Sequence, residues 1–451
     1  MATTDAIDSG RDFPATYAAS AITGHRVLFD RVHLALKKNK GEQLVLRSDF
    51  SYFTIDDQIY YVGFADDFGP MNLGCVFQFC SILDKELEKS PTNPIALLGL
   101  YDLRHITNYV FLAGSYMLLR LHRSVDTVID TLQPLFQHML PYRDVSPGPQ
   151  NFQLHVEDCW RGLSKAIHLE WVDFGPGGFD VDEYMHLDSP LNADLHEVVP
   201  GKFIAMRGPR DCPDGVIWED AVGEDGTFSH RDFSPQHYAE ILEQFDVQAV
   251  VRLNAPQYDG RAFLDAGIAV ADLFFEDCTC PPVDIAAKFL AIAEALPGAL
   301  AVHCQAGLGR TGTLIALYMM KHHGFTAREA MGWLRIVRPG SVIGEQQHFL
   351  CAREALMRRS RAPLLASCGA VPGRGDAAAA QALIDGTVRA YDARFAAAMR
   401  RGGEVGGGAA GGGGAQSAAP QEVSEALAAH VAAAGRRRDA ARSARRLSEQ
   451  L

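Results

Sequence analysis

The chain has 451 residues, 22% of them charged, and a formal net charge of -13 at pH 7. This length exceeds one ordinary domain and indicates two or three, each able to bury its own core. Residues 359–451 contain 13 Arg, no Lys and 8 acidic residues, a net of +5, which leaves -18 on residues 1–358. Such an acidic segment argues against a nucleic-acid partner and favours basic peptides as binding partners.

Cysteine usage and hydropathy narrow the class of protein further. Nine irregularly spaced Cys do not form a disulfide framework and indicate a reducing compartment. The first twenty residues lack the basic and apolar runs of a signal peptide. The longest apolar stretch, residues 94–121, is interrupted by charged side chains, so it predicts buried helices and no membrane partner.

The first half of the chain predicts one domain and a linker. Residues 1–13 resemble a polar tail, and residues 14–172 alternate elements typical of an α/β domain. Its clearest element is a helix at residues 105–122, which is apolar almost all round and is therefore expected to be central. Residues 173–198, rich in Gly, Pro and acids, predict a linker with a short acidic helix.

The second half of the sequence predicts a catalytic domain at residues 199–361, followed by a tail. Three short apolar strands alternate with helices, which favours a largely parallel sheet flanked by helices. Thr279 is the expected N-cap of the helix after the second strand, and Thr326 with Glu329 forms a capping box. Residues 362–451, dominated by Ala, Gly and Arg, predict a disordered tail, in which the Gly-rich part cannot hold a core and the Ala and Arg segments form helix only transiently. The strands are expected at 247–254, 267–275 and 299–303, and the helices at 281–296, 310–323, 326–337 and 345–359.

Two segments place an Arg six residues after a Cys, HCQAGLGRT from His303 and CGAVPGR from Cys368. This spacing alone is a weak signal, so the structural context must decide. The second segment has no strand before it, a Pro within it and low-complexity sequence after it. In the first, a buried strand precedes Cys304 and a helix follows Arg310, so only Cys304 is a credible nucleophile.

The loop from Cys304 to Arg310 is suited to a tetrahedral dianion. Its backbone N-H groups can converge on one anion in front of a helix N-terminus. The same field favours thiolate over thiol, so Cys304 is expected to be ionised at neutral pH. Arg310 supplies a planar fork for two phosphoryl oxygens, and Thr311 can donate to the sulfur when it leaves. His303 is expected to fix the loop through backbone hydrogen bonds. The residues expected to surround the phosphate are Gln305, Ala306, Gly307, Leu308 and Gly309.

A phosphoserine leaving group also needs a general acid. The loop LFFEDCTCPP follows the neighbouring strand, and parallel strand ends gather at one edge of the sheet. Glu276 and Asp277 both qualify, and spacing alone does not choose between them.

Longer motifs resemble one known family, the cell division cycle fourteen phosphatases, dual-specificity enzymes of mitotic exit. The resemblance covers roughly residues 14–358 and includes the phosphatase signature His-Cys-x-x-Gly-x-x-Arg-Ser/Thr in full. The similar segments, in order, are DDFGPMNL (66–73), FDVDEYMH (179–186), VPGKFIA (199–205), AVVRLN (249–254), DLFFED (272–277), AVHCQAGLGRTGTLIA (301–316) and RPGSVIGEQQHFL (338–350).

The resemblance implies two tandem phosphatase-fold domains, of which only the second is catalytic. In agreement, none of Cys75, Cys80 and Cys159 has an Arg six residues on. The family's Phe-Phe-x-Asp loop selects Asp277 as the general acid. Its water-positioning glutamine falls on Gln346 or Gln347, with Gln346 favoured. No metal or cofactor is implied.

The same resemblance implies substrates with phosphoserine followed by Pro and a downstream basic residue, bound in an acidic groove. Asp182, Glu183 and Asp188 are the groove residues expected in this chain. It also implies opposition to cyclin-dependent kinases and a location in nucleus and cytoplasm, with nucleolus, centrosome or spindle as further sites. The Arg-rich segment 435–446 is either a solvated tail or a nuclear import signal.

Three departures from the family pattern stand near the site. Gln305 replaces a common Lys beside the nucleophile, Met185 replaces an acid in the linker helix, and Cys278 and Cys280 replace small polar residues. The two cysteines are expected to be inert, with a reversible disulfide to Cys304 or a metal site as alternatives.

Two other functions fit parts of the pattern. A phosphoinositide phosphatase would use the same loop, but Gln305 and Leu308 stand where tensin-homologue relatives carry Lys for extra phosphates. A non-catalytic phosphoprotein-binding scaffold would be expected to lack Cys304, Arg310 or the acid, and all three are present.

Overall fold

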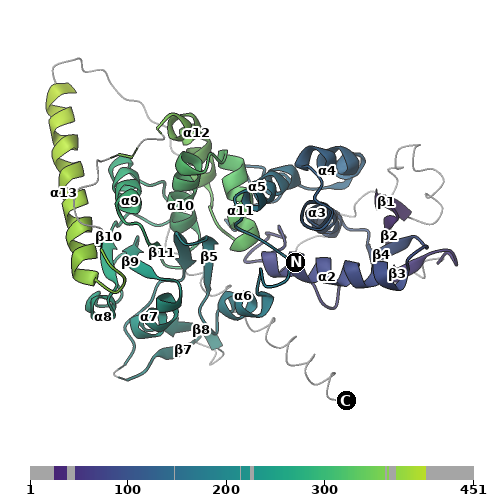
Figure 1. The fold of residues 1–451 in the computed structure, drawn as a ribbon, viewed down its shortest axis with the longest axis horizontal. Helices are drawn as coiled ribbons and strands as arrows, with labels where there is room; N and C mark the ends of the chain where they lie inside the picture. Colours follow the sequence, from purple (N-terminus) through teal and green to yellow (C-terminus); the bar gives the residue numbers. More distant parts are fainter. Residues whose placement is uncertain are drawn as a thin grey trace. The chain divides into compact units, whose positions relative to one another are not determined.

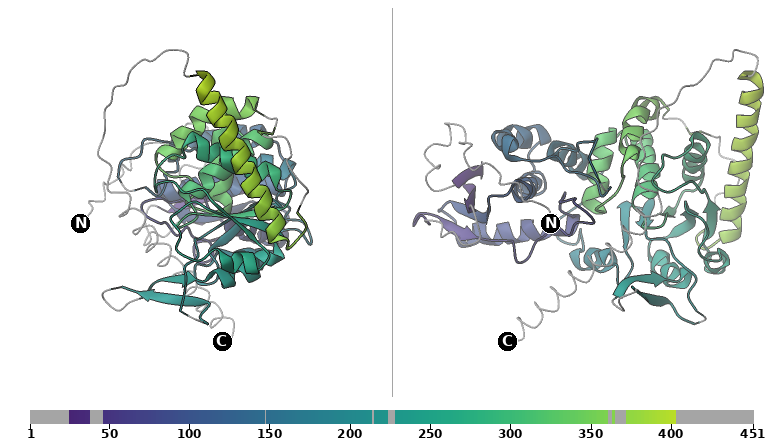
Figure 2. Two further views of the ribbon diagram at one scale, coloured as in Figure 1. Left: turned by 90° about the vertical axis from the view of Figure 1, so that its left-hand side faces the viewer. Right: turned by 180° about the vertical axis from the view of Figure 1, so that it is seen from behind.

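The computed structural model describes residues 25–37, 46–146, 148–213, 215–223, 228–360, 363–364 and 372–402, drawn in Figures 1 and 2. The chain divides into two compact units, residues 1–60 with 75–140 and residues 61–74 with 141–451. Among the described residues, no helix combines the length and apolar character needed to cross a membrane.

The first unit is built on a four-stranded sheet in the order β1-β2-β4-β3. β2 and β3 run parallel to β4, and only β1 is antiparallel to its neighbour. Helix α3 starts behind Asp102, whose side chain accepts from the N-H groups of Arg104 and His105, and is buried over 106–119. This confirms the predicted central helix. The elements are β1 (His25–Phe29), β2 (Val32–Lys37), β3 (Ser51–Phe53), α2 (Leu73–Lys89), β4 (Ile95–Leu100), α3 (Leu103–Leu119), α4 (Val125–Leu132) and η2 (Gln133–His138).

The second unit contains a five-stranded sheet in the order β10-β9-β11-β6-β5. β10, β9, β11 and β6 are parallel, and β5 is antiparallel to β6 at the edge. The predicted largely parallel sheet is thus confirmed. The strands are β5 (Leu195–Val199), β6 (Phe203–Met206), β9 (Val247–Arg252), β10 (Ala269–Asp272) and β11 (Ala299–His303), and β7 (Trp218–Val222) with β8 (Phe228–Phe233) forms a separate hairpin.

Helices cover both faces of this sheet because its strands are apolar on both sides. On one face, Ile204 and Met206 pack with Tyr238 and Leu242 of α7 (Pro235–Gln244) and with α8 (Arg261–Asp265). On the other, Phe203 stacks on Phe289 of α9 (Val283–Ala295) and meets Tyr318 of α10 (Gly309–His322).

Two further helices, α5 (Val156–His168) and α11 (Ala327–Val337), pack closely within the second unit. A Cβ atom at Gly162 would lie 2.4 Å from the Glu329 carbonyl oxygen, and one at Gly332 would lie 2.7 Å from that of Asp158. Only glycine permits this approach. The sequence predicts residues 61–74 and 141–172 in the first domain, whereas the compact units group them with the second.

The predicted helix boundaries agree with the structure to within three residues, and one predicted N-cap is wrong. The capping box of Thr326 and Glu329 is present at the start of α11, and α12 spans Glu345–Arg359 as expected. Thr279, however, is not an N-cap: α9 begins behind Pro282, and the Thr279 hydroxyl donates to the Glu276 carbonyl. The two prolines at 281 and 282 delay the start of the helix.

The prediction of a disordered tail from residue 362 is wrong for residues 377–402, which form helix α13. In Figure 1 it lies beside β10 and α9. Gln381 accepts from the backbone N-H of Val270 at 2.9 Å, so the helix covers the sheet edge. Its buried residues recur at helical spacing, a pattern masked in the sequence by the many alanines. They are Ala377, Ala380, Leu383, Ile384 and Thr387. Residues 403–451 lie outside the described residues.

A buried ion pair joins α9 to α10, and its removal is expected to destabilise the second unit. Lys321 and Glu294 are in contact with side-chain exposures of 0% and 6%, and His322 also contacts Glu294 at 2.9 Å. Lys321→Met leaves a buried carboxylate without its ammonium partner, so the free energy of unfolding should fall by about 3–5 kcal/mol. Urea denaturation measures this change.

The matched control is Lys288→Met, which removes the partner of the half-exposed Asp392. Its expected cost is below about 1 kcal/mol because water screens that pair. Equal urea midpoints for Lys321→Met and Lys288→Met would contradict the conclusion that the buried pair of Lys321 and Glu294 stabilises the second unit. Burial acts to raise the pKa of Glu294, but hydrogen bonds from His322 and Lys321 outweigh it and lower the pKa. This stabilisation is therefore present at neutral pH and is lost as pH falls through that pKa.

Candidate active site

The loop from Cys304 to Leu308 connects β11 to α10, as the sequence predicts. All five residues of β11 are buried, Cys304 is 4% exposed, and α10 begins at Gly309. Gly307 has a φ of +67°, and a Cβ atom there would lie 1.9 Å from the Met206 carbonyl oxygen. No other residue fits, which explains the glycine at this place in the loop.

His303 holds the start of this loop. Its Nδ1 lies 3.0 Å from the Cys304 carbonyl oxygen, and its Nε2 lies 2.9 Å from the Tyr258 hydroxyl. Burial lowers the pKa of His303 to about 4, so the imidazole is neutral at physiological pH. These contacts agree with the predicted structural role, and Tyr258 is a partner that sequence reasoning missed.

Arg310 and Asp277 meet beside the loop. Arg310 is 3% exposed, and one terminal nitrogen donates to the Phe275 carbonyl at 2.8 Å, so the guanidinium has a fixed direction. Its Nε lies 3.1 Å from Asp277 Oδ1. Glu276, in contrast, is exposed. The fold thus places Asp277, and not Glu276, next to Arg310.

Thr311 occupies the third position of α10 and is completely buried. Its hydroxyl has no hydrogen-bond partner among the described residues. A buried hydroxyl without a partner is costly. The partner predicted from the sequence is the Cys304 thiolate.

Gln346 and Gln347 have different surroundings. Gln346 Nε2 donates to the Thr279 carbonyl at 2.9 Å, and its Oε1 lies where a side chain at Gly309 would have to go. It therefore contacts both the acid loop and the cysteine loop. Both amide ends of each glutamine are engaged: Gln346 Oε1 also accepts from the Ile343 N-H at 3.1 Å, and Gln347 contacts Asp144 and accepts from Arg335 at 2.8 Å. The difference between the two is the acid loop, which Gln346 contacts through Thr279.

The middle of the loop is packed against apolar side chains. Ala306 and Leu308 are buried with Val145 and Ile343, and Cys278 packs against the same cluster. Gln305 is half-buried, and its carbonyl accepts from the Gly208 N-H at 2.9 Å. Burial and Asp277 raise the pKa of Cys278 to about 12, so this thiol stays protonated.

The linker helix α6 (Val181–Asp188) carries the expected acids, but only two of them are exposed. Asp182 and Glu183 face solvent at the first turn, where the Asp180 side chain accepts from their N-H groups. Asp188 is 6% exposed, and its carboxylate lies 3.0 Å from His196 Nε2. The expectation that Asp188 is a groove acid therefore needs correction, because this last residue of α6 is buried against His196.

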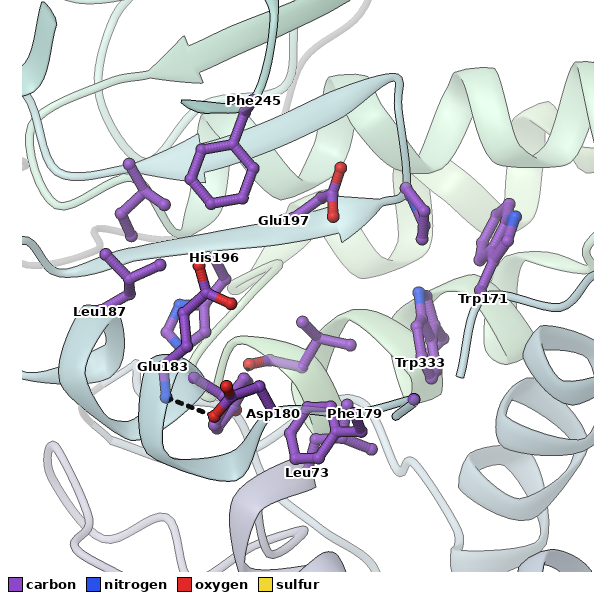
Figure 3. Close-up of a pocket in the computed structure, with 15 residues that line it drawn as sticks. Leu73, Trp171, Phe179, Asp180, Glu183, Leu187, His196, Glu197, Phe245 and Trp333 are labelled. Carbon is purple, nitrogen blue, oxygen red and sulfur yellow. Dashed lines mark hydrogen bonds between the residues drawn. The ribbon is translucent and has the colours of Figure 1, made fainter. Parts of the chain in front are cut away.

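A pocket of about 220 Å³ lies along α6. Figure 3 shows Asp180 and Glu183 on the helix and Glu197 on β5 across from them. Burial raises the pKa of Glu197, and the nearby Glu183 adds to the effect. Aromatic side chains complete the lining, including Trp171, Phe179, Tyr184, Phe245 and Trp333. The sequence did not predict Asp180 or Glu197 as residues of this pocket. Glu197 comes close to the helix only through the pairing of its strand in the sheet.

Cys278 and Cys280 are both unpaired in this structure. Within the described ranges, no group of three or more His, Cys, Asp or Glu side chains could hold a metal ion.

Comparison with known proteins matches this architecture to a class of enzymes. Residues 26–166 match the N-terminal half of dual specificity protein phosphatases, and residues 233–354 match the dual specificity phosphatase catalytic domain. The fold and the cysteine loop thus define a two-domain dual specificity phosphatase architecture, which confirms the predicted fold class.

Individual relatives identify the family. The dual specificity protein phosphatase CDC14A of Homo sapiens is 40% identical over 72% of this chain and 53% of that protein. CDC14C of Homo sapiens is 38% identical over 72% of this chain and 70% of that protein, and CDC14C of Symphalangus syndactylus is 39% identical over 72% and 64%. The chain belongs to the CDC14 family. It spans about half the length of human CDC14A.

Proposed function

We propose that this protein is a dual specificity phosphatase that hydrolyses phosphoserine, phosphothreonine and phosphotyrosine in proteins through a phosphocysteine intermediate. The observation that carries the proposal is the contact of Asp277, from the loop after β10, with Arg310, which follows the Cys304 loop at the start of α10. Its relatives bear the names of dual specificity and tyrosine-protein phosphatases.

The first step transfers the phosphoryl group to the protein. The Cys304 thiolate attacks phosphorus, and the bond from phosphorus to the substrate oxygen breaks. Arg310 and the loop N-H groups bind the equatorial oxygens as charge develops on them. Asp277 gives its proton to the departing oxygen, so the alcohol leaves neutral.

The second step returns the free enzyme. Asp277, now a carboxylate, takes a proton from water, and the water oxygen attacks phosphorus while the bond to Cys304 sulfur breaks. Thr311 donates to the departing thiolate. Gln346, which contacts both loops, is suited to orient the water. Inorganic phosphate is released.

The two glutamines give a matched test of the second step. Gln346→Ala should slow phosphocysteine hydrolysis by about tenfold or more, so rapid mixing with a phosphoaryl ester should give a burst of the phenol before the steady state. Gln347→Ala should instead leave Asp144 and Arg335 underbonded and lower stability by about 1–3 kcal/mol, without a burst. A burst confined to the Gln347 variant would reverse the assignment.

We further propose that preferred sites are phosphoserine followed by Pro and a downstream basic residue, as expected for an enzyme opposing cyclin-dependent kinases. The exposed acids Asp182 and Glu183 and the net charge of -18 on residues 1–358 support a basic partner. Gln305 and Leu308 offer no cations for a multiply phosphorylated inositol.

A substrate panel tests this specificity. It compares pSer-Pro, pThr-Pro and pTyr peptides, each with and without a downstream Lys or Arg, together with phosphoinositides. We expect kcat/KM to be highest for pSer-Pro with the basic residue, and to fall toward that of the peptide without it when Asp182 and Glu183 are both changed to Ala. Faster phosphate release from phosphoinositides would contradict the proposal.

We also propose a location in nucleus and cytoplasm, with the Arg-rich segment 435–446 as an import signal. This segment lies outside the described residues. Deleting residues 435–451 should deplete the protein from the nucleus, and an unchanged distribution by fluorescence microscopy would reject the signal.

A further inference from the structure

Arg338 touches the cysteine loop but has no part in the proposed chemistry. It caps the C-terminus of α11 and is 1% exposed. Its Nε donates to the Gly307 carbonyl at 2.8 Å, and a terminal nitrogen donates to the Ala306 carbonyl at 2.8 Å. One guanidinium therefore holds two successive peptide groups of the loop that surrounds Cys304.

The direction of these two carbonyls fixes the direction of two donors. In a trans peptide the C=O of one residue and the N-H of the next point in opposite directions. Carbonyls held toward Arg338 therefore turn the N-H groups of Gly307 and Leu308 to the opposite side of the loop. Such N-H groups stabilise an anion only when they are fixed in advance.

Arg338 is itself fixed by two polar residues, one of which contacts a third. Its terminal nitrogens lie 2.9 Å from Asp194 Oδ1 and 3.0 Å from His196 Nδ1. His196 Nε2 in turn lies 3.0 Å from Asp188 Oδ1 at the end of α6. Asp188, His196 and Asp194 are 6%, 4% and 7% exposed, so all three act in a dry environment.

The charge state of His196 agrees with this arrangement. Burial lowers its pKa, as does Arg338, while Asp188 opposes the change. A neutral imidazole with its proton on Nε2, toward Asp188, leaves Nδ1 free to accept from Arg338. Asp188 thereby selects the tautomer that Arg338 needs.

We propose that Arg338 and His196 are positioning residues of the phosphate loop, and that Asp188 connects them to the linker helix α6. In this arrangement the three residues hold the carbonyl groups of Ala306 and Gly307. The N-H groups of Gly307 and Leu308 therefore face the phosphate and the Cys304 thiolate. The inference rests on the proposed role of Cys304.

The first test is the pH dependence of Cys304 alkylation by iodoacetamide, mapped by mass spectrometry. Arg338→Ala should move the midpoint to higher pH, because two donors to the thiolate are no longer fixed. The other groups at the loop, Arg310, His303 and Asp277, are unchanged in this variant. The kcat/KM for a phosphoaryl ester should fall about 10²-fold or more.

Two substitutions of His196 separate positioning from simple burial. The amide oxygen of His196→Asn can stand near the Nδ1 position and accept from Arg338, whereas the amide of His196→Gln reaches toward the Nε2 position and Asp188. We expect the Asn variant to restore the alkylation midpoint to near that of the unmodified protein. The Gln variant should resemble Arg338→Ala.

Lys321→Met serves as the control, because it also removes a buried cation but lies at the far end of α10. It should lower stability without moving the Cys304 midpoint. Unchanged midpoints for Arg338→Ala and His196→Gln, or a shift as large in Lys321→Met, would overturn the inference. Failure of the proposed function looks different: Cys304 of the unmodified protein would then show no alkylation below the pH range of an ordinary thiol.

Discussion

Cys304→Ser is expected to reduce kcat for a phosphoaryl ester by about 10⁴-fold or more, because a serine hydroxyl in this loop stays protonated where a thiolate would be formed. Cys304 is 4% exposed at the end of a fully buried strand, so the shorter bond to oxygen should leave the fold intact. Steady-state release of the phenol measures the loss, and circular dichroism checks the fold.

The chain supplies its own control for this experiment. Cys368 has the same spacing to an arginine as Cys304 does. Cys368→Ser should leave kcat and KM unchanged, because no strand and helix N-terminus frame that cysteine in the sequence. Equal rates for the unmodified protein and Cys304→Ser would refute the enzymatic mechanism.

Asp277→Ala is expected to show an effect that depends on the leaving group. For a phosphoseryl peptide kcat should fall about 10²-fold or more, since an alkoxide cannot leave unprotonated. For p-nitrophenyl phosphate the loss should be about tenfold or less, because the nitrophenolate leaves without a proton. The comparison of the two substrates identifies proton donation and separates it from general damage to the site.

Glu276→Ala is the matched control, since Glu276 is the adjacent acid and is exposed. It should change neither rate by more than about twofold. A larger loss in Glu276→Ala than in Asp277→Ala would move the general acid by one residue. Parallel losses on both substrates in Asp277→Ala would indicate that Asp277 mainly orients Arg310, with which it is paired at 3.1 Å.

Much of the second unit is readable from local sequence. Three features each depend on residues that are neighbours in the sequence. They are the strand before Cys304, the helix from Gly309 and the capping box at Thr326. Such patterns arise from backbone propensity and periodic burial. The tail helix α13 shows the opposite case, because its helix is held by contacts with β10 and α9 that are about a hundred residues away in sequence.

The choice between neighbouring residues depends on long-range packing. Asp277 and Glu276 are equivalent by spacing, and the contact with Arg310 separates them. Gln346 and Gln347 are equally close in sequence, and their partners separate them: Gln346 donates to Thr279 in the acid loop, whereas Gln347 contacts Asp144 and Arg335. An acidic helix predicts solvated side chains, but the end of α6 turns Asp188 inward toward His196.

The sequence by itself determined the α/β class, the candidate nucleophile and the family, because these depend on a contiguous strand, loop and helix around Cys304. Only the tertiary structure decided how the loop is held, because Arg338 lies 142 residues from His196 and 31 residues from Gly307 in the sequence. These contacts depend on the pairing of β5 with β6 and on the packing of α11, which no local pattern encodes.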